Sequence, residues 1–136
     1  MKSGSILIIE EEAIIALEMK MRLEAHGYEV VSLARSPEDG VKLASKLQPD
    51  LIITEVFFKG ELSGINAVSR IKKLTQIPVI YLTTLSYLES DPIITATKPE
   101  GFISKPVDDE KLFEVIAKVN PKHNKKNIIA VWIIDS

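Results

Sequence analysis

Cysteine is absent from this 136-residue chain, and its absence excludes disulfides, thiol nucleophiles and cysteine-bound zinc. No apolar run reaches the roughly 18–20 residues that a membrane-spanning helix needs. Neither sign of charge dominates, because the formal net charge is only −2, and this gives no case for a nucleic-acid or membrane partner. The amino terminus also lacks a basic stretch followed by an apolar segment, so we expect a cytoplasmic protein.

The chain does contain enough apolar residues for one buried core. Hydrophobic residues make up 46% of the sequence and charged residues 26%, which is typical of a globular domain. We expect one domain over residues 1–120 and a tail over residues 121–136. The tail carries an apolar, β-prone run at 128–134. Such a run promotes aggregation when exposed, so we expect it to pair on a sheet edge or to exchange between subunits of a homodimer; a disordered end is the alternative.

Short apolar segments alternate with segments of helical periodicity five times. Strands are expected at 5–9, 28–33, 51–54, 78–82 and 101–104, and helices at about 12–26, from 36 onward, and at 64–74, 87–97 and 108–119. Ser36 and Pro37 suit the N-cap and first position of the second helix. Pro92 predicts a short or distorted fourth helix. This alternation predicts an α/β fold, with helices on both faces of a parallel sheet.

The faces of three helices can also be predicted from their apolar residues. The first helix carries two apolar stripes, although a helix packed on a sheet needs only one. We expect one stripe to face the core and the other to be partly exposed; they are Ile15, Met19 and Leu23, and Ile14, Leu17 and Met21, respectively. In the second and third helices, Leu47 and Leu74 are expected to point inward.

Polar and charged residues gather where the predicted strands end. Glu10 and Glu11 follow the first strand, Glu55 a central strand, Thr83 the fourth and Lys105 the fifth. Because the carboxyl ends of parallel strands meet at one edge of a sheet, these side chains are expected to converge. Converging carboxylates are ligands for a hard divalent cation such as magnesium, and a nearby lysine neutralises the cluster or holds an anion. Ordinary surface charge at the start of each loop is the alternative.

Five segments of the sequence carry a resemblance to a known family. They are Ile-Leu-Ile-Ile-Glu-Glu-Glu at 6–12, Gly-Tyr-Glu-Val-Val at 27–31, Pro-Asp-Leu-Ile-Ile-Thr-Glu at 49–55, Pro-Val-Ile-Tyr-Leu-Thr-Thr at 78–84 and Gly-Phe-Ile-Ser-Lys-Pro at 101–106. In order and spacing, they resemble the receiver domain of two-component response regulators. The resemblance covers about residues 6–119. It implies a flavodoxin-like (βα)5 fold with a five-stranded parallel sheet of order 2-1-3-4-5.

The resemblance implies roles for four residues that follow or end the first and third strands. The family's phospho-accepting aspartate falls on Glu55, its acidic metal-binding pair on Glu10 and Glu11, and a magnesium-binding backbone carbonyl on Phe57. The family has aspartate where Glu55 and Glu11 stand, so each side chain is one methylene longer. In-line attack on phosphohistidine and the octahedral shell of magnesium both leave little positional tolerance. We therefore predict poor phosphate acceptance and weak or absent magnesium binding.

The resemblance also implies a switch threonine at Thr83, a switch aromatic at Phe102 and the characteristic lysine at Lys105. The Glu55 carboxylate could reach Lys105 and Thr83, as a phosphoryl oxygen does in activated relatives. One carboxylate charge would then replace the roughly −1.5 to −2 of a phosphate. Three outcomes stay open: an active-like lock, an inert glutamate paired with Lys105, and slow phosphorylation.

These observations predict a receiver-like module of two-component (phosphorelay) signalling that is degenerate at its acceptor and is not an enzyme. We expect it to act by contact with a histidine kinase or another signalling protein. The expected surface is the fourth helix, fifth strand and fifth helix, and a homodimer could form there or through the tail. A receiver that accepts phosphate from a histidine kinase is one alternative. A flavodoxin-like nucleotide- or flavin-binding module is another, weakened because no glycine-rich phosphate loop follows the first strand.

Overall fold

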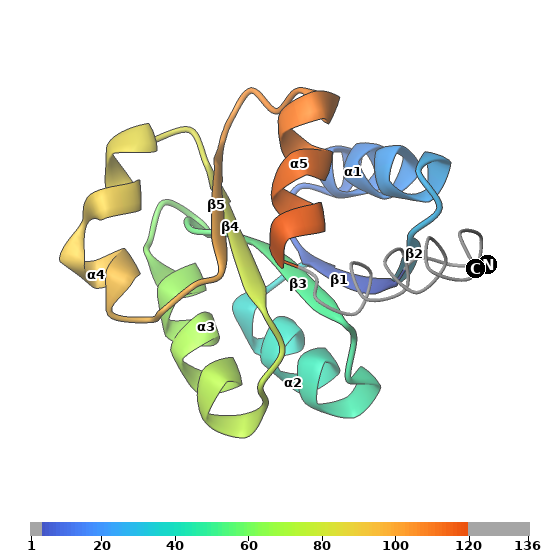
Figure 1. The fold of residues 1–136 in the computed structure, drawn as a ribbon. Helices are drawn as coiled ribbons and strands as arrows, with labels where there is room; N and C mark the ends of the chain where they lie inside the picture. The colour runs from blue at the N-terminus through green and yellow to red at the C-terminus, as the bar shows by residue number, and fades with distance from the viewer. Residues whose placement is uncertain (1–3, 120–136) are drawn as a thin grey trace, which may run out of the picture.

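Five parallel strands form the centre of the fold, in the spatial order β2-β1-β3-β4-β5 (Figure 1). The computed structural model describes residues 4–119, so the predictions for the tail at 121–136 lie outside the described residues. This order confirms the flavodoxin-like (βα)5 fold that the resemblance implies. The strands are β1 (Ser5–Ile9), β2 (Glu29–Ala34), β3 (Leu51–Glu55), β4 (Val79–Thr83) and β5 (Gly101–Ser104).

Helices cover both faces of this sheet (Figure 1). Buried residues of α1 and α5 share one apolar cluster, and those of α2, α3 and α4 share the cluster on the other face. The fourth helical segment is short and irregular, as Pro92 predicted: a 3-10 turn precedes a single α-helical turn. The helices are α1 (Ala13–Ala25), α2 (Pro37–Leu47), α3 (Ser63–Leu74), η1 (Ser86–Ser90), α4 (Pro92–Thr95) and α5 (Asp109–Val119).

The central strands are buried on both sides, which explains their continuous apolar sequence. Successive side chains of β1 alternate between the two clusters: Ile6 and Ile8 join the cluster under α1 and α5, whereas Leu7 and Ile9 join the other. This burial makes the sheet a rigid frame, and it sets the positions of the side chains that follow the strand ends. Across residues 4–119, no helix is both long and apolar enough to cross a membrane.

Two of the predicted helix faces need correction. Leu47 and Leu74 were expected to point inward, but their exposed fractions are 39% and 62%. Each is the last residue of its helix, so the preceding turns already supply the contacts with the sheet, through Ala44 of α2 and Ile71 of α3.

The two stripes of α1 separate as predicted, with one change. Met19 and Leu23 are buried, but Ala16 rather than Ile15 completes the fully buried face. The second stripe faces outward, with exposed fractions of 83% at Ile14, 51% at Leu17 and 64% at Met21.

Candidate functional site

The carboxyl edge of the sheet brings together three of the predicted site residues. Glu10 directly follows β1, Glu55 is the last residue of β3, and Lys105 directly follows β5. Backbone hydrogen bonds continue past the strand ends here: Glu10 N donates to Ala34 O at 2.8 Å, and Lys105 N donates to Thr83 O at 2.8 Å. The sheet backbone therefore fixes the positions from which all three side chains extend.

Gly64 holds the backbone at the end of β3. Its N–H donates to Val56 O at 3.0 Å. A Cβ at this position would collide with the backbone oxygens of Glu55 and Val56, so only glycine lets the start of α3 come this close. The close approach keeps the Glu55 backbone from shifting.

Lys105 lies between two carboxylates. Its Nζ is 2.5 Å from Oε2 of Glu55 and 3.5 Å from Oε1 of Glu10. The side-chain exposed fractions are 21% for Lys105, 12% for Glu55 and 6% for Glu10. The short contact is an ion pair, and apart from Lys105 the Oε2 atom of Glu55 has no partner in residues 4–119. Lys105 thus compensates the charge of Glu55.

The environment raises the pKa of Glu55 to about 6. Burial is the main cause; Lys105 lowers this pKa, and the negative charges of Glu10 and Glu12 raise it. For Lys105, burial lowers the pKa, but the carboxylates of Glu55 and Glu10 outweigh burial, so the net shift is upward. Near pH 7 the pair is therefore mostly ionised on both sides.

Glu11 turns away from this pair. Both of its carboxylate oxygens accept the backbone N–H of Lys59, at 2.9 and 3.1 Å, from the connection between β3 and α3. Its backbone oxygen accepts from Arg35 Nε at 2.6 Å. Glu10 uses Oε2 to accept the N–H of Glu12 at 2.9 Å. Sequence reasoning did not predict these contacts with Lys59, Arg35 and Glu12, because all three depend on loop backbone geometry.

The acidic residues do not fit a magnesium ion in this arrangement. Within the described chain, no three acidic or histidine side chains are grouped so that they could hold a metal ion. Glu11 is engaged by Lys59, and Lys105 occupies the space between Glu10 and Glu55. Magnesium requires near-octahedral oxygen ligands at short distances, and this cluster presents an ammonium group instead.

Neither of the two predicted switch residues bonds to the pair through its side chain within residues 4–119. Thr83, the last residue of β4, is only 1% exposed, and its Oγ1 accepts the N–H of Leu85 at 3.2 Å. Over residues 4–119, no hydrogen bond joins Thr83 to Glu55. Phe102 and Phe57 are partly buried and pack against the cluster under α2, α3 and α4. The site therefore consists of the Glu10–Lys105–Glu55 cluster. Thr83 accepts the backbone N–H of Lys105, but within residues 4–119 its hydroxyl bonds to neither carboxylate.

A cavity of about 260 Å³ adjoins this cluster. It lies between α1 and the connection from β5 to α5, and Glu10 and Lys105 line its inner end. Apolar side chains such as Ile15, Met19 and Val107 form much of its wall. The cluster can thus be reached from the side of α1.

Comparisons with known proteins agree with this fold. A family model described as the response regulator receiver domain matches residues 6–117. The chain is 34% identical over 116 residues to the phyllosphere-induced regulator PhyR of Methylorubrum extorquens, which covers 83% of this chain and 42% of that protein. It is 31% identical over 118 residues to protein PilH of Pseudomonas aeruginosa, which covers 84% of this chain and 95% of that protein.

A solved structure gives the same result for the fold. The signal receiver domain of a modulated diguanylate cyclase from Desulfovibrio desulfuricans superposes with a TM-score of 0.78 at 25% identity, covering 90% of this chain and 98% of that one. The chain spans about half the length of the first curated relatives it matches. The matched model covers most of the chain and the strand order is the same, so this chain belongs to the response regulator receiver domain family.

Proposed function

We propose that this chain is a degenerate receiver module of two-component signalling, which acts by contact with other signalling proteins rather than by accepting a phosphoryl group. One observation carries the proposal: Lys105 lies 2.5 Å from Glu55, the residue at the family's acceptor position. The acceptor-equivalent carboxylate is thus already paired with the lysine that, by the family resemblance, would hold an incoming phosphoryl group.

Two features of the neighbouring residues support this proposal. The acidic pair next to Glu55 is divided, because Glu11 binds the Lys59 N–H while Glu10 faces Lys105. Phosphoryl transfer depends on in-line positioning and on charge neutralisation by a metal, and this arrangement favours neither. Lys105 is also the only partner of Glu55 Oε2 among residues 4–119.

Of the three outcomes left open for Glu55, we favour the inert ion pair. An active-like lock would need the acceptor-side oxygen to recruit the switch hydroxyl. Within residues 4–119, Thr83 Oγ1 accepts the N–H of Leu85 and makes no hydrogen bond with Glu55. The pair therefore compensates charge without reproducing the contacts of a bound phosphoryl group.

The proposed partner surface is formed by η1, α4, β5 and α5. Tyr87 of η1 and Ile93 of α4 are large apolar side chains with exposed fractions of 67% and 50%. A polar groove of about 240 Å³ lies on the same elements and is lined by residues that include Glu89, Phe102 and Lys111. Exposed apolar side chains bordered by charged ones are typical of protein-binding surfaces. A histidine kinase or another signalling protein is the expected partner.

The labelling of Glu55 tests the proposal. Wild-type protein would be incubated with acetyl phosphate and magnesium and analysed by intact mass and peptide mapping. We expect no stoichiometric acyl phosphate on Glu55. The Glu11→Asp/Glu55→Asp double variant, which restores both family side chains, is expected to become labelled.

A matched control separates this effect from general acidity. Glu12→Asp shortens an exposed neighbouring glutamate and should leave the protein unlabelled. Stoichiometric labelling of wild-type Glu55 would overturn the proposal. It would favour the alternative in which this receiver accepts phosphate from a histidine kinase.

A further inference from the structure

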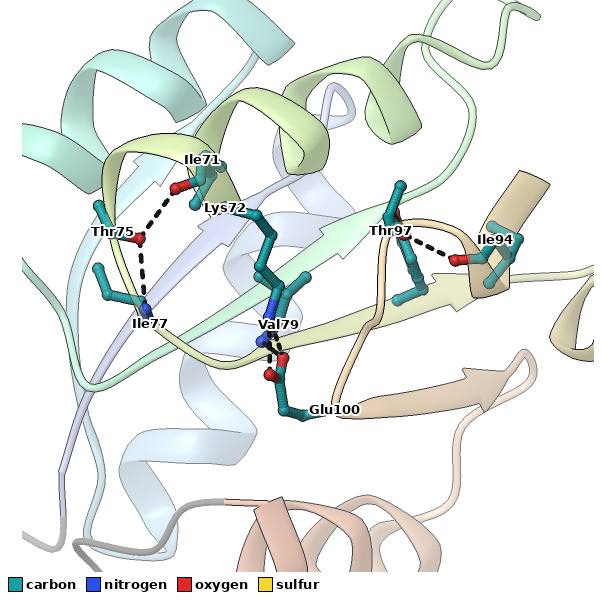
Figure 2. Close-up of polar contacts among 9 residues, drawn as sticks. Ile71, Lys72, Thr75, Ile77, Val79, Ile94, Thr97 and Glu100 are labelled. Atoms are coloured by element: carbon teal, nitrogen blue, oxygen red, sulfur yellow. Dashed lines mark hydrogen bonds and ion pairs between the residues drawn. The ribbon is translucent and has the colours of Figure 1, made fainter. Parts of the chain in front are cut away.

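A second polar cluster lies at the opposite edge of the sheet from Glu55, where β4 and β5 begin (Figure 2). A cavity of about 480 Å³ opens there between the end of α3 and the connection from α4 to β5. Its volume falls in the range of about 300–1,000 Å³ that is typical of small-molecule sites. The polar side chains that line it include Ser69, Lys72, Lys73, Gln76, Lys98 and Glu100.

Lys72 and Glu100, which both line this cavity, form a hydrogen-bonded ion pair (Figure 2). Lys72 Nζ donates to both carboxylate oxygens of Glu100, at 2.5 and 2.7 Å. Glu100 Oε1 also accepts the N–H of Val79 at 2.8 Å. These bonds tie the end of α3 to the first residue of β4, so the position of Lys72 is set in advance.

The wall formed by the connection from α4 to β5 is also held by hydrogen bonds (Figure 2). Thr97 Oγ1 donates to Ile94 O at 2.7 Å, and it lies 2.8 Å from the hydroxyl oxygen of Tyr81. Because the single Thr97 proton goes to a carbonyl, the Tyr81 hydroxyl must donate to Thr97. Tyr81 is fully buried, so this bond anchors the wall to the core.

The opposite wall is the end of α3. Thr75 Oγ1 donates to Ile71 O at 3.1 Å and accepts the N–H of Ile77 at 3.3 Å. Ile71 O also accepts the backbone N–H of Thr75, at 2.8 Å. The negative end of the helix dipole opposes an anion here, and Lys72 and Lys73 in the last turn offset it.

The cavity carries an excess of positive charge. Three lysines line it against a single glutamate, and that glutamate is bonded to Lys72. Lys73 and Lys98 are exposed, and neither has a carboxylate partner among residues 4–119. Since the whole chain is net negative at −2, this excess is local. Two unpaired ammonium groups beside the bonded Lys72–Glu100 pair favour an anionic ligand.

We propose that this cavity binds a small sugar phosphate. The ammonium groups of Lys73 and Lys98 would hold the phosphate, since lysine binds phosphate as a point charge. Ser69 and Gln76 make no hydrogen bonds through their side chains within residues 4–119, and they would bond the sugar hydroxyls. Among residues 4–119, no aromatic ring on which a nucleobase could stack lines the cavity, so a sugar phosphate fits better than a nucleotide.

A titration followed by amide NMR tests this site, with glucose 6-phosphate as the probe on the full chain. We expect saturable shifts confined to amides of residues 69–76 and 96–100. Glucose alone should cause none, and inorganic phosphate should bind more weakly. Absence of saturable shifts at about 10 mM probe would overturn the proposal. Any binding would then be weaker than a dissociation constant of about 10 mM, which corresponds to a binding free energy of about −2.7 kcal/mol. Equal binding of inorganic phosphate would overturn the assignment to a sugar phosphate.

Variants locate the binding to the two unpaired lysines. Lys98 has a φ of 52°, so Lys98→Asn keeps a residue type that tolerates this left-handed backbone. The Lys73→Gln/Lys98→Asn variant should weaken glucose 6-phosphate binding about tenfold or more. A matched control, Lys42→Gln/Lys46→Gln, removes two exposed lysines from α2 and should bind as wild type. Equal weakening in both variants would mean nonspecific attraction and would overturn the site.

Discussion

The two ends of the sheet each hold a lysine–glutamate pair, and the pairs have the same closest distance of 2.5 Å. At the amino end, both oxygens of Glu100 accept from Lys72, and one also accepts the Val79 N–H. At the carboxyl end, Glu55 meets Lys105 through one oxygen that has no other partner in residues 4–119. Glu100 is 39% exposed, whereas Glu55 is 12% exposed.

The difference shows that a short distance does not by itself define what an ion pair contributes. At Glu100 both carboxylate oxygens are hydrogen-bonded and the side chain is partly exposed. Water can therefore solvate the partner that is left when one charge of this pair is removed. The Glu55 carboxylate is more buried and lies beside a second carboxylate, that of Glu10. Its negative charge is therefore compensated by one partner, Lys105. Residues with unsatisfied groups and shifted pKa values concentrate at functional edges of a fold, and Glu55 lies at the edge where this family has its acceptor.

The largest expected effect comes from removing Lys105, the lysine at the carboxyl end of the sheet. Lys105→Met leaves the Glu55 carboxylate buried without a counterion, and we expect a loss of about 2–3 kcal/mol in the free energy of unfolding at pH 8. Because Lys105 lowers the pKa of Glu55, its removal raises that pKa further. Protonation then relieves the penalty, so the loss should be smaller at pH 5. Urea unfolding at the two pH values measures this.

The control for this prediction is the double variant Glu55→Gln/Lys105→Met. With no charge left at position 55, most of the stability at pH 8 should return. An equal loss for Lys105→Met at pH 5 and pH 8 would mean that packing of the lysine stem, rather than the unpaired carboxylate, is responsible.

The next effect is the pH dependence of the wild-type protein. The Glu55 pKa is about 6 in the folded state against an ordinary value of 4.5, so between these values the folded state binds more protons than the unfolded state. Stability from this group is fully present below about pH 4.5 and is lost as pH rises through about 6. The difference corresponds to about 2 kcal/mol. Glu55→Gln should flatten the unfolding free energy over this window, and carboxyl NMR can follow the titration directly.

Much of this architecture was predictable from the sequence. Ser36 and Pro37 open α2 as expected, since Ser36 Oγ accepts the N–H of Asp39 at 3.1 Å. The approach of Glu55 to Lys105 was also predictable, because parallel strands fix which edge each residue reaches. Local periodicity and strand direction were sufficient for these predictions.

Contacts that depend on loop backbone or on distant partners were not predictable. The turn of Glu11 toward Lys59 needs the path of the connection between β3 and α3. The pairing of Lys72 with Glu100 joins residues 28 positions apart, and nothing in either local pattern marks it. The sequence pattern thus predicts which edge a residue reaches, and the loops decide which partner it meets there.

The smallest expected effect is at Glu100, at the amino end of the sheet. Glu100→Gln removes the charge but keeps an oxygen for the Val79 N–H, so we expect a loss of only about 0.5–1 kcal/mol in unfolding free energy at low salt. In 1 M sodium chloride the loss should nearly vanish, because exposed ion pairs are screened. Glu38→Gln is a matched control, since Glu38 pairs with Arg70 at 2.7 Å on the surface. If the loss at Glu100 persists in high salt while the loss at Glu38 disappears, the Glu100 pair behaves like the buried Glu55 pair. The contrast between the two ends of the sheet would then be wrong.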